Sequence, residues 1–306
     1  MHVAVAIVGF RTPDDIFRCL EALAGSAHTD FEVSICENGG PAAFAALMAG
    51  LPVALPGGQP VKAVQAPSNL GYAGGVNTAM RQAPDADAWW VLNPDTLPHP
   101  EALARLVARL EVGDCELAGG TIHFPDGTVE SHGGRWRSWL GRAQSVGYGD
   151  PLDKPVDAPT HERTLSYFSG ASLLVSRRFL EVTGPMHEDY FLYCEEIEWC
   201  LRGLALGMRL GYAPGALVLH NQGSSTGSVA DITKRPRMPV YLDERNKILV
   251  TRDRFPGHLP VAALATLALL VMRFGRRRAW RQLGYALQGW WAGMLNQRGA
   301  PRWFRV

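Results

Sequence analysis

The chain has 306 residues, of which 47% are hydrophobic and 19% are charged, and its formal net charge is +1. This composition indicates one large globular unit, with or without an appendage, and excludes a mainly disordered chain. The near-neutral charge argues against a nucleic-acid partner, and five cysteines without a C-x-x-C pair argue against a disulfide framework, so a reducing cytosol is expected.

Short apolar runs alternate with amphipathic stretches in the first third of the chain. No basic segment precedes the first run, so we expect no signal peptide and a first strand at residues 3–10. Further strands are predicted at 32–36, 61–64 and 89–92, and helices at 14–24, 76–82 and 100–110. This alternation predicts a mostly parallel sheet covered by helices on both faces, with ligands at the carboxyl ends of its strands.

The pattern weakens at residues 113–165, which are predicted to form an ordered excursion without sustained periodicity. It returns with an apolar run at 171–175, a helix beginning near 177 and a helix at about 195–206. Residues 221–240 read as a polar loop, and the chain from 241 onward reads as helical. We therefore predict two parts, residues 1–240 and residues 241–306.

The first candidate site is Asn93-Pro94-Asp95, which directly follows the predicted strand WWVL. A carboxylate at the carboxyl end of a buried strand suits Mg²⁺ or Mn²⁺ bridging a diphosphate, because hard cations prefer oxygen ligands. The alternative is a plain turn, for which Asn-Pro and Asp-Thr are typical.

The second candidate is the glycine-rich segment from Asn69 to Asn77. Closely spaced glycines let backbone N–H groups approach a phosphate or ribose, and a following helix N-terminus attracts anions. The spacing is neither that of the dinucleotide motif nor that of the P-loop. A simple turn between strand and helix stays open as an equal alternative.

The third candidate is an acidic segment with three carboxylates between Glu195 and Glu198. Helical spacing places Glu195 and Glu198 on one face and lets Glu198 pair with Arg202, whereas Glu196 points elsewhere. A partly buried carboxylate near others has a raised pKa, which suits a general base. The alternative is that Glu195, Glu198 and Arg202 only form structural ion pairs.

The fourth candidate is His220, which ends an apolar run and precedes a polar loop. A metal ligand and a structural histidine are both consistent with this position.

Taken together and in this order, these segments resemble glycosyltransferase family 2, of GT-A fold, and within it the bacterial rhamnosyltransferase-like and galactofuranosyltransferase-like enzymes. The resemblance covers about residues 3–252 and is carried by VAIVGFRT, ICENG, NLGYAGGVN, LNPDT, SGA, YCEE and His220. Two positions depart from the family pattern. Asn93 replaces the first acid of its DxD motif, and Glu196 stands where Asp is usual.

The resemblance implies an α/β fold of GT-A type, a Rossmann-like and mostly parallel sheet covered by helices, here with a C-terminal helical appendage. It implies that Glu196 is the base with Glu195 beside it, and that Asp95 and His220 hold Mg²⁺ or Mn²⁺. The implied donor-binding residues are Gly9, Phe10, Arg11, Glu37, Asn69, Gly71, Gly74, Asn77, Asn93 and Asp95. The implied acceptor-side residues are Ser169, Gly170, Ala171 and Trp199.

The implied activity is that of a metal-dependent inverting hexosyltransferase of cell-surface polysaccharide synthesis. The acceptor hydroxyl, deprotonated by Glu196, attacks the anomeric carbon in a single displacement. The donor is a dTDP- or UDP-linked sugar, with dTDP-rhamnose favoured, and the acceptor is a glycan or a lipid-linked sugar. Two alternatives stay open: a sugar-nucleotide nucleotidyltransferase, and a membrane-tethered scaffold without catalysis.

The C-terminal part joins an apolar run at 259–272 to a segment rich in arginine and tryptophan. The run is shorter than the about 20 residues that a spanning helix needs. With Arg276, Arg277 and Arg278 it suits an interfacial contact with anionic lipid, so we expect a cytoplasmic protein, peripheral at the inner face of the cell membrane. A buried helix in the appendage, or at a homodimer interface, is the equal alternative.

Overall fold

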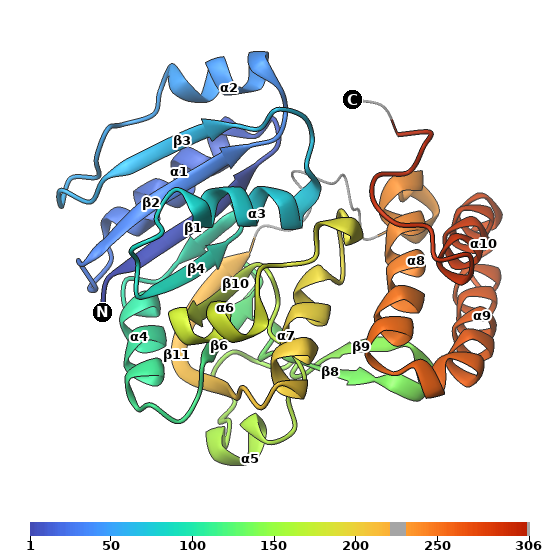
Figure 1. Ribbon diagram of the computed structural model, residues 1–306. Coiled ribbons are helices and arrows are strands. Elements are labelled where there is room, and N and C mark those ends of the chain that lie inside the picture. The colour runs from blue at the N-terminus through green and yellow to red at the C-terminus, as the bar shows by residue number, and fades with distance from the viewer. Residues whose placement is uncertain (221–230, 305–306) are drawn as a thin grey trace.

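The computed structural model describes residues 1–220 and 231–304. A large sheet runs through the molecule, with helices on both of its faces and a group of three helices at one end (Figure 1). The strands are β1 (Val3–Gly9), β2 (Phe31–Glu37), β3 (Val61–Gln65), β4 (Ala88–Leu92), β5 (Thr96–Pro98), β6 (Leu117–His123), β7 (Val129–Ser131), β8 (Gly134–Arg137), β9 (Arg142–Ser145), β10 (Ser172–Ser176) and β11 (Leu210–His220). The helices that cover the sheet are α1 (Pro13–Ala24), α2 (Pro41–Met48), α3 (Gly71–Arg81), α4 (Ala102–Glu111), α5 (Ala158–Glu162), α6 (Arg177–Thr183) and α7 (Glu195–Ala205).

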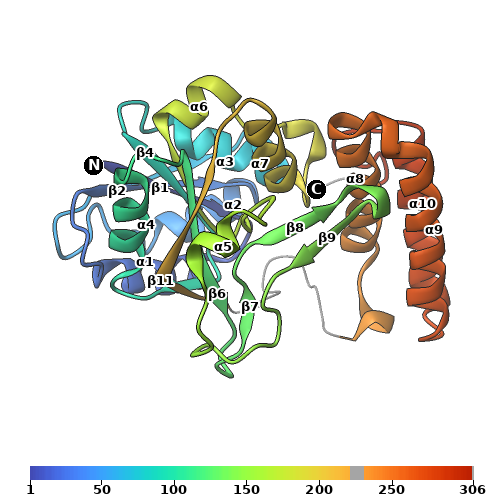
Figure 2. The same ribbon diagram turned by 90° about the horizontal axis from the view of Figure 1, so that it is seen from below.

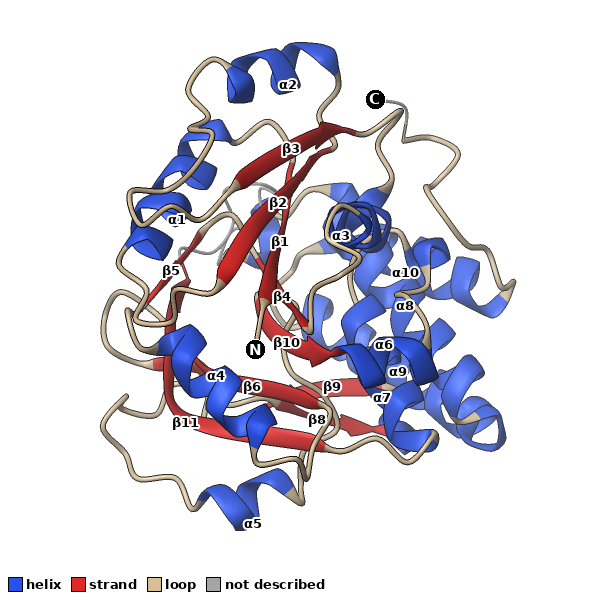
Figure 3. Ribbon diagram, turned by 60° about the vertical axis from the view of Figure 1, so that its left-hand side comes forward, coloured by secondary structure: helices blue, strands red, loops and turns tan. Residues whose placement is uncertain are grey.

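The strand order in the main sheet is β3-β2-β1-β4-β10-β6-β11-β5, and β7 pairs with β6 outside this path (Figure 3). Strands β1 to β4 are parallel, and β10 is antiparallel to both β4 and β6. Strand β11 is parallel to β6. Consequently β1, β4, β6 and β11 all end at the same edge, which gathers residues distant in sequence.

The two faces of the sheet are covered by different helices, as the alternation along β1 requires. Val3, Val5 and Ile7 pack with apolar residues of α1 and α4, whereas Ala4 and Ala6 pack toward α3 and α7. All five side chains are fully buried. The predicted α/β fold of GT-A type, with a sheet covered on both faces, is confirmed.

The prediction for residues 113–165 missed a central strand, because β6 reads LAGGTIH and its glycines signal a turn. The structure explains why glycines occupy the middle of this strand. A Cβ on Gly119 would lie 2.2 Å from the Phe168 ring, and one on Gly120 would lie 2.1 Å from the Ala216 carbonyl oxygen. Glycine is required there for close packing, while the strand itself is buried throughout.

Two predicted boundaries also differ from the structure. Helix α3 begins at Gly71 and not at Val76, so the glycine-rich segment is mostly helical. Helix α8 (Arg237–Arg254) begins inside the predicted loop and spans the division predicted at residue 240, while residues 221–230 of that loop lie outside the described part of the chain.

The C-terminal appendage consists of α8, α9 (Leu259–Gly275) and α10 (Trp280–Met294), which pack on one another. The β8–β9 hairpin extends from the sheet toward these helices (Figure 2). At its tip, the short helix η1 (Ser138–Leu140) contacts α9, and the Trp139 ring stacks on His258 with 3.7 Å between ring centroids. The predicted helical appendage is confirmed, whereas its independence as a domain stays a prediction.

Candidate active site

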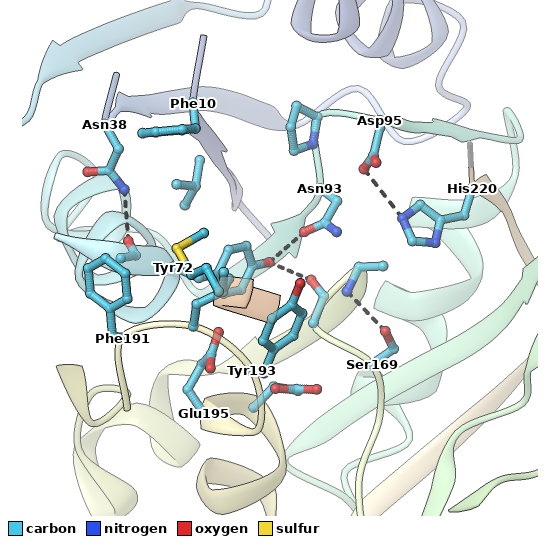
Figure 4. A pocket seen from close by; sticks show the side chains of 18 of the residues that line it. Phe10, Asn38, Tyr72, Asn93, Asp95, Ser169, Phe191, Tyr193, Glu195 and His220 are labelled. Carbon is cyan, nitrogen blue, oxygen red and sulfur yellow. Dashed lines mark hydrogen bonds and ion pairs between the residues drawn. The ribbon is translucent and has the colours of Figure 1, made fainter. Parts of the chain in front are cut away.

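A cavity of about 420 Å³ opens at the sheet edge where β1, β4 and β11 end (Figure 4). It is lined by residues of all six sequence segments singled out above and by His220, and in addition by the loop before α7, by β7 and by α8. The lining residues are Val8, Phe10, Asn38, Asn69, Gly71, Tyr72, Asn93, Pro94, Asp95, Glu130, Ser169, Gly170, Ala171, Phe191, Leu192, Tyr193, Glu195, Glu196, His220 and Met238. The segments that were predicted one by one as candidate sites therefore line the same cavity.

One side of the cavity carries an acid–histidine–acid chain. The Nε2 atom of His220 lies 3.3 Å from Oδ1 of Asp95, and its Nδ1 lies 2.8 Å from Oε2 of Glu130. Burial lowers the pKa of His220, but the hydrogen bonds to Asp95 and Glu130 outweigh it and raise the pKa to about 9. An imidazolium between two carboxylates holds this chain together when no other cation is present.

The Asp95–His220–Glu130 arrangement has the form of a metal site, in which Asp95 and His220 would be the ligands and Glu130 is the outer hydrogen-bond partner of His220. If a cation replaced the Nε2 proton, Glu130 would fix the histidine tautomer by accepting the Nδ1 proton, and the Nε2 lone pair would face the cation beside Asp95. An imidazole nitrogen and a carboxylate oxygen on adjacent strand ends suit Mn²⁺ or Mg²⁺ with oxygens of a bound diphosphate completing the shell. Asp95 and His220 thus fit the predicted cation, with only two protein ligands among the described residues.

Glu195 lies on the opposite side of the cavity (Figure 4), and the adjacent Glu196, also in the first turn of α7, lines the same cavity. Glu195 is 2% exposed, and within the described part of the chain its Oε2 has no hydrogen-bond partner. Burial raises the pKa of Glu196 to about 7, and burial together with Glu196 raises the pKa of Glu195. A carboxylate of this kind is able to accept a proton near neutral pH.

The third acid of the segment has a different role. Glu198 is fully buried and lies 3.1 Å from Arg202 Nε and 3.5 Å from Arg254 Nε. The predicted pairing of Glu198 with Arg202 is confirmed, but Glu195 does not share that face. Helix α7 starts at Glu195, so the side chain of this first residue turns into the cavity beside Glu196.

A strained loop places the two carboxylates. Phe191, Tyr193 and Cys194 all have positive φ, at 68°, 73° and 67°, in the turn directly before α7. Three side chains in that conformation persist only when their surroundings determine it. The side-chain amide of Asn246 lies 2.8 Å from the Leu192 carbonyl and 2.6 Å from that of Tyr193. Helix α8, which contains Asn246, thereby holds the loop.

The floor of the cavity is a hydrogen-bonded junction of three segments. The Tyr72 hydroxyl lies 2.8 Å from Oδ1 of Asn93 and 2.7 Å from the Gly170 carbonyl oxygen. Gly71 has φ +72°, and a Cβ there would lie 2.0 Å from the Phe191 carbonyl oxygen, so this position admits glycine alone. Asn93, which replaces the usual first acid, is thus a structural link rather than a lost charge.

Several predicted donor residues lie outside the cavity lining. The buried carboxylate of Glu37 accepts backbone N–H groups of Arg11 at 3.1 Å and Gly39 at 2.7 Å, so it holds its own loop together. A Cβ on Gly9 would collide with that carboxylate at 2.3 Å. Arg11 extends to the Gly39 carbonyl.

Three further predictions fall on packing residues. Asn77 of α3 is buried and exchanges hydrogen bonds with the backbone of Met186, and Gly74 packs against Leu70. Trp199, predicted on the acceptor side, is fully buried and donates its Nε1 proton to the Gly184 carbonyl. It follows Glu196 by three residues, but the helix turns it into the core.

Other lining residues were harder to identify as site residues from the sequence. Asn38 donates to the Gly71 carbonyl at 2.8 Å, and it directly follows Glu37 at the end of β2. Glu130 lies in the stretch that shows no periodicity, and Met238 in the predicted loop. Only the folded chain brings Glu130 to His220, over 90 residues of sequence.

Fold and site together define a nucleotide-sugar-dependent transferase of GT-A type: a mixed sheet covered on both faces, an acid and a histidine at its strand ends, and a carboxylate pair opposite. The model of the glycosyltransferase-like family 2 matches residues 2–237, and the chain belongs to this family. It is a nucleotide-sugar glycosyltransferase.

Two proteins named for their transferase activities are similar to this chain over most of its length. A low-salt glycan biosynthesis hexosyltransferase of Haloferax volcanii is 25% identical over 252 residues, covering 76% of this chain and 75% of that protein. An N-acetylglucosaminyl-diphospho-decaprenol L-rhamnosyltransferase of Mycobacterium tuberculosis is 27% identical over 253 residues, covering 70% and 76%.

Solved structures agree on the fold. TarS of S. aureus, residues 1–349 with UDP-GlcNAc, superposes with a TM-score of 0.57 at 12% identity, covering 97% of this chain and 93% of that one. A mannosyltransferase of Pyrobaculum calidifontis with GDP-Man and Mn²⁺ gives 0.55 at 15% identity, covering 97% and 88%.

Proposed function

We propose that this protein is a metal-dependent, inverting hexosyltransferase that transfers rhamnose from dTDP-rhamnose to a hydroxyl of a lipid-linked sugar in cell-surface polysaccharide synthesis. The observation that carries the proposal is the single cavity between the Asp95–His220 pair and the Glu195–Glu196 pair. The rhamnosyltransferase relative from Mycobacterium tuberculosis supports the sugar, and its diphospho-decaprenol acceptor supports the lipid.

The residues divide the chemistry between the two sides of the cavity. Asp95 and His220 would hold a divalent cation, which neutralises charge on the leaving nucleoside diphosphate. Glu196 accepts the proton of the acceptor hydroxyl, because burial keeps the pKa of Glu196 high enough for this role, and Glu195 lies beside it in the cavity. Gly170 lies close to Glu196, because a Cβ built on Gly170 would be 3.6 Å from the Cβ of Glu196. The absence of a side chain at Gly170 leaves space for the acceptor beside Glu196. A single displacement on one face inverts the anomeric carbon.

The donor assignment predicts a specific stabilisation. With Mn²⁺ present, dTDP-rhamnose at about 100 times its dissociation constant should stabilise the protein by about 2.7 kcal/mol, because it binds the folded state only. The measurement is a thermal-shift screen of dTDP-, UDP- and GDP-linked sugars, followed by release of nucleoside diphosphate. Stabilisation by a UDP-sugar alone would correct the donor. No response to any nucleotide sugar would contradict the proposed activity.

The appendage carries a surface that we propose contacts the membrane. Helix α9 exposes Val261, Leu264, Val271 and Met272 at helical spacing, and α10 exposes Trp280, Leu287 and Trp291. These residues, here called the outer apolar face, lie on the helices farthest from the sheet (Figure 2). The exposed Arg276, Arg277 and Arg278 lie between the two stripes in sequence, and the exposed Arg281 follows Trp280. Apolar side chains flanked by arginines suit an anionic lipid surface.

The packing of α9 indicates how the appendage would contact the membrane. Among the described residues, the segment Pro256–Gly275 is long and apolar enough to cross a membrane by length and composition, which the sequence reading of 259–272 did not allow. Yet Ala262, Thr266 and Phe274 are buried against the rest of the protein. A spanning helix would lose these contacts, so we propose that α9 and α10 lie in the interface.

Substitutions on the outer apolar face should therefore release the protein from vesicles. Leu264→Glu combined with Trp291→Glu is expected to lower partition onto phosphatidylglycerol vesicles at least about 10-fold, because burying one such side chain contributes about 1.5–3 kcal/mol. Co-flotation measures it. Val112→Glu is the matched control, since Val112 is 68% exposed and Leu264 is 70% exposed.

The alternative partner of the outer apolar face is a second copy of the chain. A double variant that floats with vesicles like the wild type, yet changes from dimer to monomer in solution, would assign the face to a homodimer. Removing residues 259–306 is a weaker experiment, because Arg298 binds Asp189 and Asp253 and Gly299 donates to the Asp189 carbonyl. The truncation would loosen the loop before α7 as well.

A further inference from the structure

Arg245 is a cation in the interior of the protein, on α8, the helix that holds the loop before α7. Its side chain is 1% exposed, and burial lowers its pKa to about 10, so the guanidinium group stays charged at neutral pH. Its hydrogen bonds within the described residues go to two backbone carbonyls and one amide oxygen. A buried charge is costly unless its donors are directed at fixed acceptors. The three acceptors therefore show what this side chain holds in place.

The acceptors of Arg245 lie in two distant segments and on its own helix. Nη2 donates to the Tyr190 carbonyl at 2.7 Å, directly before the loop 191–194, in which three residues have positive φ. Nη1 donates to the Gly299 carbonyl at 2.6 Å, in the C-terminal segment that follows α10. Nε donates to Oδ1 of Asn246 at 2.8 Å. One planar group therefore joins the loop, the C-terminal segment and Asn246 in fixed directions.

The bond from Nε sets the orientation of the Asn246 side chain. An amide carries an oxygen and an NH₂ group of nearly the same shape, and only the oxygen accepts a proton from Arg245. With its oxygen held there, the NH₂ group points at the carbonyls of Tyr190, Leu192 and Tyr193, at 3.0, 2.8 and 2.6 Å. Arg245 thus acts on the loop twice, directly at Tyr190 and through Asn246.

The C-terminal segment also anchors Tyr190, through its charged neighbours. Arg298 lies 2.9 Å from Asp189 and 2.5 Å from Asp253. The Tyr190 hydroxyl donates to Asp253 at 2.7 Å, and the Gly299 N–H group donates to the Asp189 carbonyl. The residue that precedes the strained loop is therefore held at its carbonyl, at its hydroxyl and through the residue before it.

We propose that Arg245 is a positioning residue for the two carboxylates at the start of α7. It acts through the Tyr190 carbonyl and the Asn246 amide. The positive φ angles between these anchors and α7 persist only while the surroundings determine them, so loss of the guanidinium group lets the loop relax and the carboxylates move with it. A misplacement of about 1 Å is enough to slow a reaction about 100-fold. The identity of the displaced base rests on the proposed function, whereas the movement of the loop does not.

Movement of the loop is tested without turnover, through the thiol of Cys194. Cys194 is 5% exposed and burial raises its pKa, which keeps the thiol unreactive, and the other four cysteines are buried as well. In Arg245→Gln, alkylation of Cys194 by N-ethylmaleimide should become at least about 10-fold faster, because local opening no longer breaks charge-assisted hydrogen bonds. Mass spectrometry of the labelled full-length protein measures it. Cys36, in β2, is the internal reference and should keep its wild-type rate.

Kinetics separate positioning from a general loss of structure. Arg245→Gln should lower kcat about 10- to 100-fold, while the donor KM stays unchanged. The acid limb of its pH profile should remain, because Glu196 still accepts the proton, whereas Glu196→Gln should lose that limb. Arg252→Gln is the matched control with wild-type labelling and kcat. Arg252 lies on the same helix and also donates to a carbonyl, that of Met294 at 2.9 Å, but this bond joins α8 to α10 and not to the loop.

Two further variants complete the test. Arg298→Gln, at a side chain that is 24% exposed, should change labelling and kcat in the same direction as Arg245→Gln by a smaller factor. Arg245→Lys keeps the charge but not the planar group, and should stay closer to Arg245→Gln than to the wild type. Wild-type labelling of Cys194 in folded Arg245→Gln, or faster labelling with unchanged kcat, would overturn the proposal.

The remaining outcomes are equally decisive. Full recovery in Arg245→Lys would assign the effect to charge alone and would overturn the positioning role. If Arg245→Gln does not fold, wild-type labelling and kcat in Arg298→Gln overturn the proposal instead. A fully active Glu196→Gln would show that the proposed base is wrong, while the labelling of Cys194 still reports whether Arg245 holds the loop.

Discussion

Glu196→Gln is expected to lower turnover by roughly 10²–10⁴-fold, the usual size of general-base catalysis. Glutamine keeps the size and hydrogen-bonding capacity of the side chain but accepts no proton at neutral pH. The donor affinity should barely change, because Glu196 adjoins Glu195, which lies across the cavity from the Asp95–His220 pair (Figure 4). Single-turnover kinetics at saturating donor, together with donor titration, measure the two effects separately.

The pH dependence tests the same assignment. The base acts when deprotonated, and burial raises the pKa of Glu196 to about 7. Turnover should therefore fall as the pH drops through about 7, well above the ordinary pKa of a glutamate carboxyl group. The Gln variant should lose this acid limb of the profile. A wild-type profile that is flat down to pH 5 would show that Glu196 is not the proton acceptor.

The neighbouring acids provide matched controls. Glu195→Gln should cost less than Glu196→Gln, because we place Glu196 as the proton acceptor and Glu195 as its neighbour in the cavity. Glu198→Gln should mainly lower the free energy of unfolding, because Glu198 pairs with Arg202 and Arg254 outside the cavity. An inactive Glu195→Gln beside a near-normal Glu196→Gln would move the base by one residue.

Asp95→Ala is expected to abolish transfer, a loss of roughly 10³-fold or more, since stabilising charge on the leaving diphosphate contributes several kcal/mol. Metal-dependent binding of the nucleotide should disappear with it. The His220 imidazolium would keep Glu130 as a partner in this variant, so the fold should survive. Isothermal titration of dTDP with and without Mn²⁺ measures the binding loss independently of turnover.

His220→Ala should act in the same direction but less severely, because Asp95 remains as a charged ligand. Glu130→Gln should weaken metal affinity about 10–100-fold, the usual effect of removing an outer partner of a ligating histidine. Thr128→Ala is a suitable control two residues before Glu130, since within the described part of the chain its hydroxyl bonds to Asp126. Full turnover of EDTA-treated enzyme would show that the metal assignment is wrong.

The sequence by itself was sufficient for strands β1 to β4, for helices α1, α3 and α4 and for the order of the site segments, but not for helix α2 or the central strand β6. Strand β1 and helix α1 could be predicted because their burial follows local periodicity, which is a property of consecutive residues. Asp95 and His220 were identifiable because each directly follows or ends an apolar strand. The acidic segment was identifiable because carboxylates seldom interrupt aromatic residues without a role.

Only the tertiary structure determines which of the candidate site residues come together at the cavity. Glu37 and Asn77 carry the right chemistry in the right segments, but their partners at Arg11 and Met186 bind them into the scaffold. The reverse holds for Glu130, whose histidine partner lies 90 residues away. Helix α8 holds the loop before α7 through Asn246, and no local pattern encodes a contact over more than fifty residues. Side-chain direction and long-range pairing arise from packing, so they become visible only once the chain is folded.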